Sequence, residues 1–226
     1  MFILRLSLTF LLAVHLAIAD NQQRPVRNYR GIDVDGPFQV TVDLNGKEGA
    51  VLDTADPGLF ERVQTVVDNQ ILRIRFQGNG QDVGSELIKV FISAFSLVSL
   101  EGNGPSRMTV LQSLKEPNIQ LVSKGSSWMS LSVDTFVVRC QLTGSGTIEI
   151  NGKCAGLDVI GQGSPSFKGL RLETDVAVVS VQANGQAEIS VKAALAGHVS
   201  GKARLRYDGA PQVNVKTSGT GSVVHV

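Results

Sequence analysis

The sequence predicts an all-β protein whose mature part is a single-stranded parallel β-helix, or β-solenoid, with coils of about 20 residues. Three observations predict this fold. Gly-x-Gly triplets recur along the second half of the chain, apolar and polar residues alternate between them, and no stretch after the first 20 residues shows a sustained helical period. The abundance of glycine, with 24 residues, and an aromatic content of only 5% are typical of short strands joined by tight turns.

Residues 1–19 are predicted to be a secretory signal peptide. Arg5 supplies the positive amino-terminal region, residues 6–18 form an apolar core, and Ala17 and Ala19 precede a cleavage site that leaves Asp20 first. The alternative is a membrane anchor, but an apolar run of about 14 residues is shorter than the roughly 20 needed to span a bilayer. We therefore expect an exported protein, periplasmic or extracellular in a Gram-negative-type envelope, with no stable membrane insertion after cleavage.

The charge balance argues against a nucleic-acid partner. Cleavage removes Arg5, so the 21 basic residues fall by one and equal the 20 acidic ones. An electrostatic footprint for nucleic acid or an anionic membrane needs clustered Lys and Arg, and this balance does not provide it. Residues 20–226 are expected to form one domain.

The first half of the mature chain alternates as half-buried strands do. Residues 38–44 place Phe38, Val40 and Val42 at period two, and residues 71–76 and 88–92 show a similar pattern. Residues 56–58, Asp-Pro-Gly, predict a turn that opens a single helical turn reaching Val67.

The repeat begins near residue 100. Its triplets are intact or degraded forms of Gly-x-Gly, and successive triplets are spaced by about 20 residues. The residues that end the triplets are Gly104, Gly125, Gly146, Gly163, Gly185, Ala203 and Gly221. These glycines are predicted to be structural, because a sharp corner favours a positive φ that glycine adopts without steric penalty.

Aligning the triplets sorts the other positions by chemistry. The positions four residues before each triplet end are apolar in all coils but the last, namely Leu100, Leu121, Leu142, Val159, Val181, Val199 and Thr217. The preceding position is polar in every coil, through Gln120 and Gln141 for example. We therefore expect the apolar positions to stack as an inward column and the polar ones to face solvent.

These residues resemble a known family, described as "putative auto-transporter adhesin, head GIN domain". The opening is Tyr-Arg-Gly-Ile at 29–32 with Gly-Pro-Phe-Gln-Val at 36–40, and the middle includes Leu-Thr-Gly-Ser-Gly at 142–146. The close is Tyr-Asp-Gly-Ala-Pro at 207–211, followed by Ser-Gly-Thr-Gly at 218–221. The resemblance runs from about residue 29 to the end of the sequence and implies an exported β-solenoid domain without a demonstrated activity.

Cys140 and Cys154 are the only cysteines. An exported protein can hold them as a disulfide. The alternative is that Cys140 packs as a small hydrophobe, because it falls in a buried column of the repeat. No histidine pair accompanies them, so we predict neither a metal site nor a cofactor.

The sequence contains no recognisable constellation of catalytic groups. A β-helix hydrolase or lyase needs carboxylates that converge on one face. Asp158 and Asp175 are almost one coil apart, with Arg171 nearby, but the alignment places the two carboxylates on different parts of the coil. We predict that the protein is not an enzyme and has no catalytic residues.

A binding role has a candidate surface. Arg107, Trp128, Glu149 and Arg206 fall three residues after the triplets in an outward column. Arg204 and Arg206 flank Leu205 and are either a small basic patch on this surface or two solvated side chains. An indole between charged side chains can stack on a sugar ring or anchor a protein. The alternative is that Trp128 only covers a sheet face. Three hypotheses follow: a binding module for polysaccharide or an envelope protein, an assembly component that associates through an uncapped solenoid end, and a carbohydrate-active enzyme.

Overall fold

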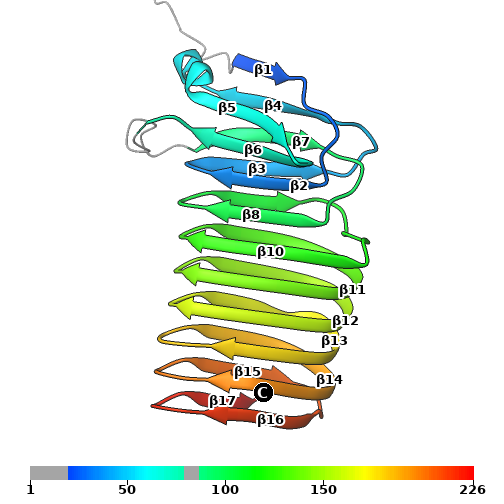
Figure 1. Cartoon of the computed structure of the whole chain (residues 1–226), viewed down its shortest axis with the longest axis vertical. Coiled ribbons are helices and arrows are strands. Elements are labelled where there is room, and N and C mark those ends of the chain that lie inside the picture. Colours follow the sequence, from blue (N-terminus) through cyan, green and yellow to red (C-terminus); the bar gives the residue numbers. More distant parts are fainter. Residues whose placement is uncertain (1–19, 79–86) are drawn as a thin grey trace, which may run out of the picture.

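The computed structural model describes residues 20–78 and 87–226, so the predicted signal peptide, with Ala17 and Ala19, lies outside the described residues. Asp20 begins the first strand, β1 (Asp20–Arg24). The described chain is nearly all β-strand and winds into one stack of coils of about 19 residues (Figure 1). The predicted β-solenoid is confirmed. In the described residues, no helix has the length and hydrophobicity needed to cross a membrane.

Each coil contributes a strand segment to two sheets, which face each other across the core. The first sheet contains β8 (Ser99–Asn103), β10 (Asn118–Gly125), the second parts of β11 (Trp128–Gly144), β12 (Thr147–Gly163), β13 (Ser166–Val181) and β14 (Gln186–Val199), and β16 (Gln212–Thr217). The second sheet contains β9 (Arg107–Val110), the first parts of β11 to β14, β15 (Arg204–Asp208) and β17 (Ser222–His225). Every pairing within this region is parallel, so each coil supplies the hydrogen-bonding edge for the next.

The amino-terminal part extends both sheets with mixed pairing. Its strands are β2 (Gly31–Asp35), β3 (Phe38–Asp43), β4 (Gly49–Thr54), β5 (Val63–Asp68), β6 (Ile71–Phe76) and β7 (Ile88–Ser93). β2 joins the first sheet between β6 and β8, and β3 joins the second between β7 and β9, all in parallel. The outermost pairs, β5–β6, β4–β7 and β1–β4, are antiparallel. Uniformly parallel strand pairing is therefore a property of the repeat and not of the amino-terminal part.

A short 3-10 helix, η1 (Pro57–Arg62), covers the amino-terminal end of the core. The Asp56 side chain accepts from the Gly58 amide at 2.9 Å, which caps the helix at the turn that the sequence predicts. Leu59 and Phe60 are buried, and Arg24 donates to the Phe60 carbonyl oxygen at 2.7 Å. The helix ends at Arg62 because Val63 starts β5, so the helical turn is shorter than predicted.

The corners between the first and second sheets have a positive φ in every repeat coil. The residues with this conformation are Gly104, Gly125, Gly144, Gly163, Ala183, Gly201 and Gly219, with φ between 59° and 99°. In four coils the corner therefore lies two residues before the end of the aligned triplet. Gly146, Gly185 and Gly221 have no positive φ, but a β-carbon there would lie 2.1 to 2.8 Å from the nearest atom. Glycine is needed at those positions for space.

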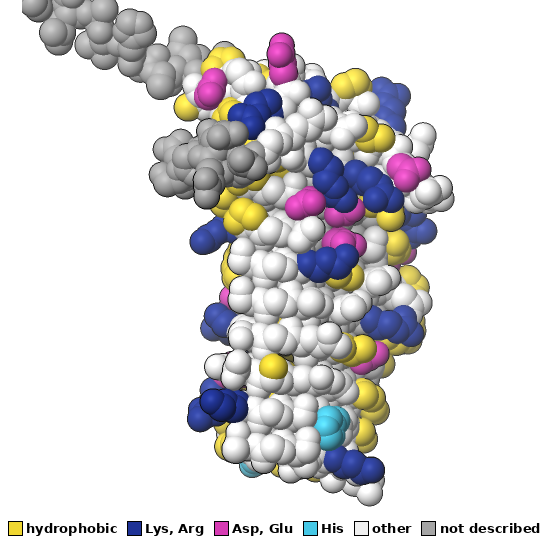
Figure 2. Space-filling model, turned by 60° about the vertical axis from the view of Figure 1, so that its left-hand side comes forward, with side chains coloured by type: hydrophobic (Ala, Val, Ile, Leu, Met, Phe, Trp, Pro, Cys, Tyr) yellow, Lys and Arg dark blue, Asp and Glu magenta, His cyan; other side chains and the backbone are white. Residues whose placement is uncertain are grey.

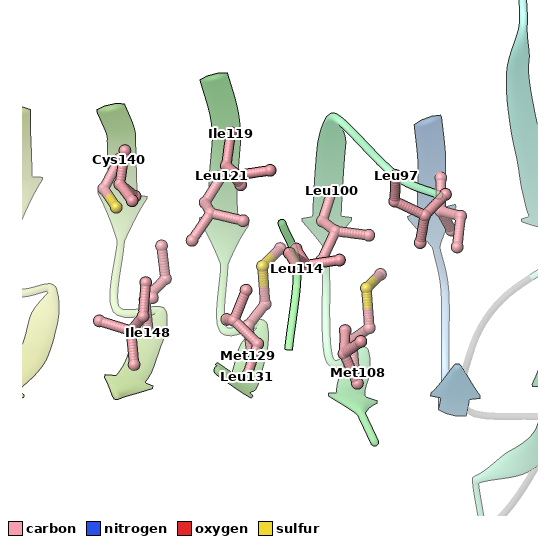
Figure 3. Packing of buried hydrophobic residues seen from close by; sticks show 14 of the residues in the cluster. Leu97, Leu100, Met108, Leu114, Ile119, Leu121, Met129, Leu131, Cys140 and Ile148 are labelled. Carbon is pink, nitrogen blue, oxygen red and sulfur yellow. The ribbon is translucent and has the colours of Figure 1, made fainter. Parts of the chain in front are cut away.

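The core is a continuous column of aliphatic side chains between the two sheets. Leu100, Leu121 and Cys140 enter it from the first sheet, and Met108, Met129, Leu131 and Ile148 enter it from the second (Figure 3). All of these residues are at most 3% exposed. Leu121 pairs with Cys140, and Cys140 pairs with Val159. The inward column that contains Leu121 therefore passes through Cys140, whereas the alignment predicted that it passes through Leu142.

Both cysteines are free, buried thiols, so the disulfide that the sequence left open is not formed. Cys140 belongs to the inner column of the first sheet, while Cys154 lies where β12 bends, with its sulfur 3.5 Å from the Thr174 hydroxyl. Burial raises the pKa of both thiols, which disfavours the reactive thiolate.

We expect neither thiol of the native protein to react with Ellman's reagent at pH 8, because both are buried and protonated. Two thiols per chain should react once guanidinium unfolds the protein. Absence of thiols in the unfolded, non-reduced protein would instead show a disulfide and contradict the free state.

Candidate functional site

The five residues of the predicted binding surface lie on the outer side of the second sheet, in two neighbouring columns. The first column contains Arg107, Trp128, Thr147, Ser166, Gln186 and Arg204. The second contains Thr109, Ser130, Glu149, Lys168, Glu188 and Arg206. We call the outer surface made by these two columns the Trp128 face.

The first column is a run of hydrogen-bonding side chains with one aromatic ring. Trp128 pairs in register with Arg107 on one side and Thr147 on the other. Glu149 is therefore not its direct neighbour, contrary to the alignment, and lies one column away beside Ser130. Trp128 is half-buried, while Arg107 and Arg204 are exposed. Adjacent strands are about 4.8 Å apart, so the column offers a new side chain at that interval along the solenoid axis.

The second column alternates in charge. Glu149 pairs with Lys168, which pairs with Glu188, and Glu188 forms an ion pair with the Arg206 guanidinium. Because both partners of that ion pair are solvent-accessible, its contribution to stability is at most about 1 kcal/mol. The acidic and basic charges of this column therefore balance one another. Arg206 belongs to this column and Arg204 to the first, so the two arginines do not form a separate basic patch.

A second cluster, which the sequence did not reveal, lies on the first sheet where the amino-terminal part meets the repeat. It surrounds a cavity of about 210 Å³ whose polar walls are Asp33, Arg73, Ser99, Glu101 and Gln120. Figure 2 shows positive and negative side chains gathered together in the upper half of the molecule, whereas the surface along the corners below is mostly uncharged.

The charges of this cluster compensate one another. Asp33 is only 8% exposed and accepts from both terminal nitrogens of Arg75, and this hydrogen bonding raises the pKa of Arg75. Arg73 lies 3.3 Å from an Asp68 oxygen, and Lys124 lies 2.6 Å from a Glu101 oxygen. The Asp33–Arg75 pair joins β2 to β6, and the Lys124–Glu101 pair joins β8 to β10, so the two pairs lie on either side of the junction between β2 and β8. A buried carboxylate requires such partners.

The residues considered for catalysis do not converge. Asp158 lies beside Arg139 and Val178 in the first sheet, whereas Asp175 lies where β13 bends between the two sheets. His198 contacts the Ser218 hydroxyl at 3.3 Å, and His225 lies 2.8 Å from the Gly209 carbonyl oxygen, so each has a local structural partner. Within residues 20–78 and 87–226, no group of three or more His, Cys, Asp or Glu could hold a metal ion.

Comparison with protein families agrees with the resemblance seen in the sequence. The profile of the family "Putative auto-transporter adhesin, head GIN domain" matches residues 28–211. The chain belongs to this family. The matched range of the head GIN domain includes the amino-terminal strands from β2 onward, the charged cluster and both columns of the Trp128 face up to Arg206. No curated protein matches the chain.

Several solved structures share the fold of this head GIN domain. A "putative adhesin" from Bacteroides fragilis has a TM-score of 0.81 at 15% identity, with 92% of this chain and 97% of that chain covered. A "putative adhesin" from Parabacteroides distasonis has a TM-score of 0.73 at 21% identity, with 92% and 97% covered. A "putative lipid binding protein" from the same species has a TM-score of 0.68 at 16% identity, with 92% and 96% covered. At these identities the likeness shows the fold alone.

Proposed function

We propose that this head GIN domain is an exported, non-enzymatic module that binds a polysaccharide through the Trp128 face. The observation that carries the proposal is the register of Arg107, Trp128 and Thr147, which places an aromatic residue between an arginine and a threonine on the outer side of one sheet. Export is supported by the predicted signal peptide and by membership of an adhesin family.

The chemistry of the first column favours a sugar polymer. An indole ring offers an apolar face for the C–H groups of a pyranose, and hydroxyl, amide and guanidinium groups exchange hydrogen bonds with sugar hydroxyls. Ser166, Gln186 and Arg204 continue the column beyond Thr147 at the strand spacing. A surface that repeats its donors and acceptors along one axis fits a ligand that also repeats.

The placement of the carboxylates supports a role without catalysis. Glycoside cleavage requires two carboxyl groups on either side of one bond. Asp158 and Asp175 lie on different parts of the coil, and the carboxylates of the charged cluster are held in ion pairs. A protein ligand of the envelope is the alternative occupant of the Trp128 face, and the experiment below distinguishes the two.

A glycan array probed with residues 20–226 tests the proposal. We expect the wild type to bind at least one polysaccharide, and Trp128→Ala to weaken that binding at least about tenfold, or ~1.4 kcal/mol. Because Trp128 is the only tryptophan, its fluorescence should change on titration with the bound glycan. Phe136→Ala is the matched control, since Phe136 is an aromatic residue that is 69% exposed outside the Trp128 face.

Two results would contradict the proposal. If the wild type binds no glycan, a polysaccharide is excluded as the ligand, and an envelope protein becomes the candidate. Equal binding by the wild type and Trp128→Ala would place the glycan away from this face.

A further inference from the structure

The two ends of the solenoid differ in how they cover the core. At the amino-terminal end, η1 places Leu59 and Phe60 over the core, and both are at most 8% exposed. At the carboxyl-terminal end, the inward residue Val213 is 42% exposed, although its column neighbours Ala177 and Leu195 are fully buried. The last described coil therefore leaves its core side open.

The strands of that coil also have free edges. In the described residues, β16 pairs only with β14, and β17 pairs only with β15. The outer edge of each strand thus presents backbone N–H and C=O groups without a strand partner. Val215 and Val223, which face inward between these two edges, are only half-buried.

The open end carries few of the features that block association. Protected edges usually contain proline, a bulge or inward-pointing charges. β16 and β17 contain no proline, and their pairings with β14 and β15 have continuous registers. Lys216 is the only Lys or Arg in the two strands, and it pairs with His198 in an outward column.

We propose that two copies of this chain associate end to end through their carboxyl-terminal coils. A partner for this end must supply two strand edges that run in opposite directions, with an apolar surface between them. The carboxyl-terminal end of a second copy supplies both strand edges and the apolar surface. The two copies would be related by a two-fold axis that is perpendicular to the long axis of the solenoid and passes through both sheets. This axis reverses the direction of the second copy's strands, so that β16 pairs with β16 and β17 with β17 in antiparallel fashion.

Two features of the fold support this arrangement. The amino-terminal end already extends parallel sheets by antiparallel strands, since β4 pairs with β7 and β5 pairs with β6 in that sense. At that end η1 covers the core with Leu59 and Phe60, so it offers no open apolar surface to match the carboxyl-terminal coil. The interface is therefore isologous and closes at two copies, without growth into a filament.

Sedimentation velocity and small-angle X-ray scattering of residues 20–226 test the proposal. We expect a concentration-dependent dimer that is about twice as long as the monomer and no wider, as two copies joined end to end require. Val213→Asp should weaken dimerisation at least about tenfold, because it places a charge in the apolar surface of the interface. Val178→Asp is the matched control, since Val178 is 46% exposed on the outer side of an inner coil and should leave the dimer intact.

Circular dichroism and thermal unfolding establish that both variants are folded before their association is compared. A wild type that stays monomeric at every concentration would overturn the proposal. It would also be overturned by a series of larger oligomers, by a side-by-side dimer, or by equal dimerisation of Val213→Asp and the wild type. Because Trp128→Ala does not alter this end, glycan binding and dimerisation can fail separately.

Discussion

Gly152→Ala is expected to destabilise the protein by at least about 3 kcal/mol, combining backbone strain with overpacking. Gly152 has a φ of 110°, in a region that an alanine rarely adopts. A β-carbon there would lie 2.0 Å from the Val133 carbonyl oxygen of the preceding coil. The two coils cannot separate locally without breaking the hydrogen bonds between β11 and β12, so little relaxation is available. Urea unfolding followed by circular dichroism measures the loss.

Gly156→Ala is the matched control because it lies in the same strand, β12. A β-carbon at Gly156 would have its nearest neighbour at 3.6 Å, an ordinary contact, and Gly156 has no positive φ. We expect this substitution to change stability by less than about 1 kcal/mol, and a small gain is consistent with a less flexible unfolded chain. Equal losses in the two variants would show that the close approach at Gly152 is not what limits the fold.

Phe167→Ala is expected to cost about 3–5 kcal/mol, as large truncations in a packed core do. Phe167 is 1% exposed and belongs to the inward column of the second sheet, between Ile148 and Ala187. Its removal leaves a cavity that the neighbouring coils cannot fill, because each strand is held in register on both edges. Guanidinium unfolding gives the change in free energy.

The contrasting variant is Phe136→Ala, which removes the same side chain from a position that is 69% exposed. We expect a change within about 0.5 kcal/mol, because little apolar surface is uncovered. A loss at Phe136 similar to that at Phe167 would mean that the exposed ring is buried in solution by a partner or by a second copy.

The sequence predicts the solenoid well because apolar and polar residues alternate within each coil. The same alternation explains the register error. Side chains repeat in orientation every two residues along a strand, so a shift of two residues exchanges Leu142 for Cys140 without turning any side chain outward. In the triplets 144–146 and 219–221, the first glycine has the positive φ and the second leaves little room for a β-carbon, and the residue letters alone do not distinguish these roles.

The candidate site was predicted only in part, because the alternation of side chains shows which residues face outward but not which of them are neighbours. The alignment assigned Arg107, Trp128, Glu149 and Arg206 to one outward column, but the two-residue shift placed Glu149 beside Trp128, whereas the structure places Thr147 there. The charged cluster was missed because Asp33 and Arg75 are 42 positions apart and meet only when β2 and β6 pair. Nothing local in the sequence distinguishes those side chains from solvated charges.

The hydrogen bonds between coils run along the long axis of the molecule, and this direction has a mechanical consequence. A load applied between the two ends of the stack pulls these bonds along their own direction, without shearing one strand past another. Since each coil contacts only its neighbours, the stack would open at its weakest junction, and adding coils would lengthen the domain without strengthening it. At the junction between β2 and β8, where the amino-terminal part meets the repeat, the ion pair of Arg30 with Glu116 adds a contact between the segment before β2 and the segment before β10.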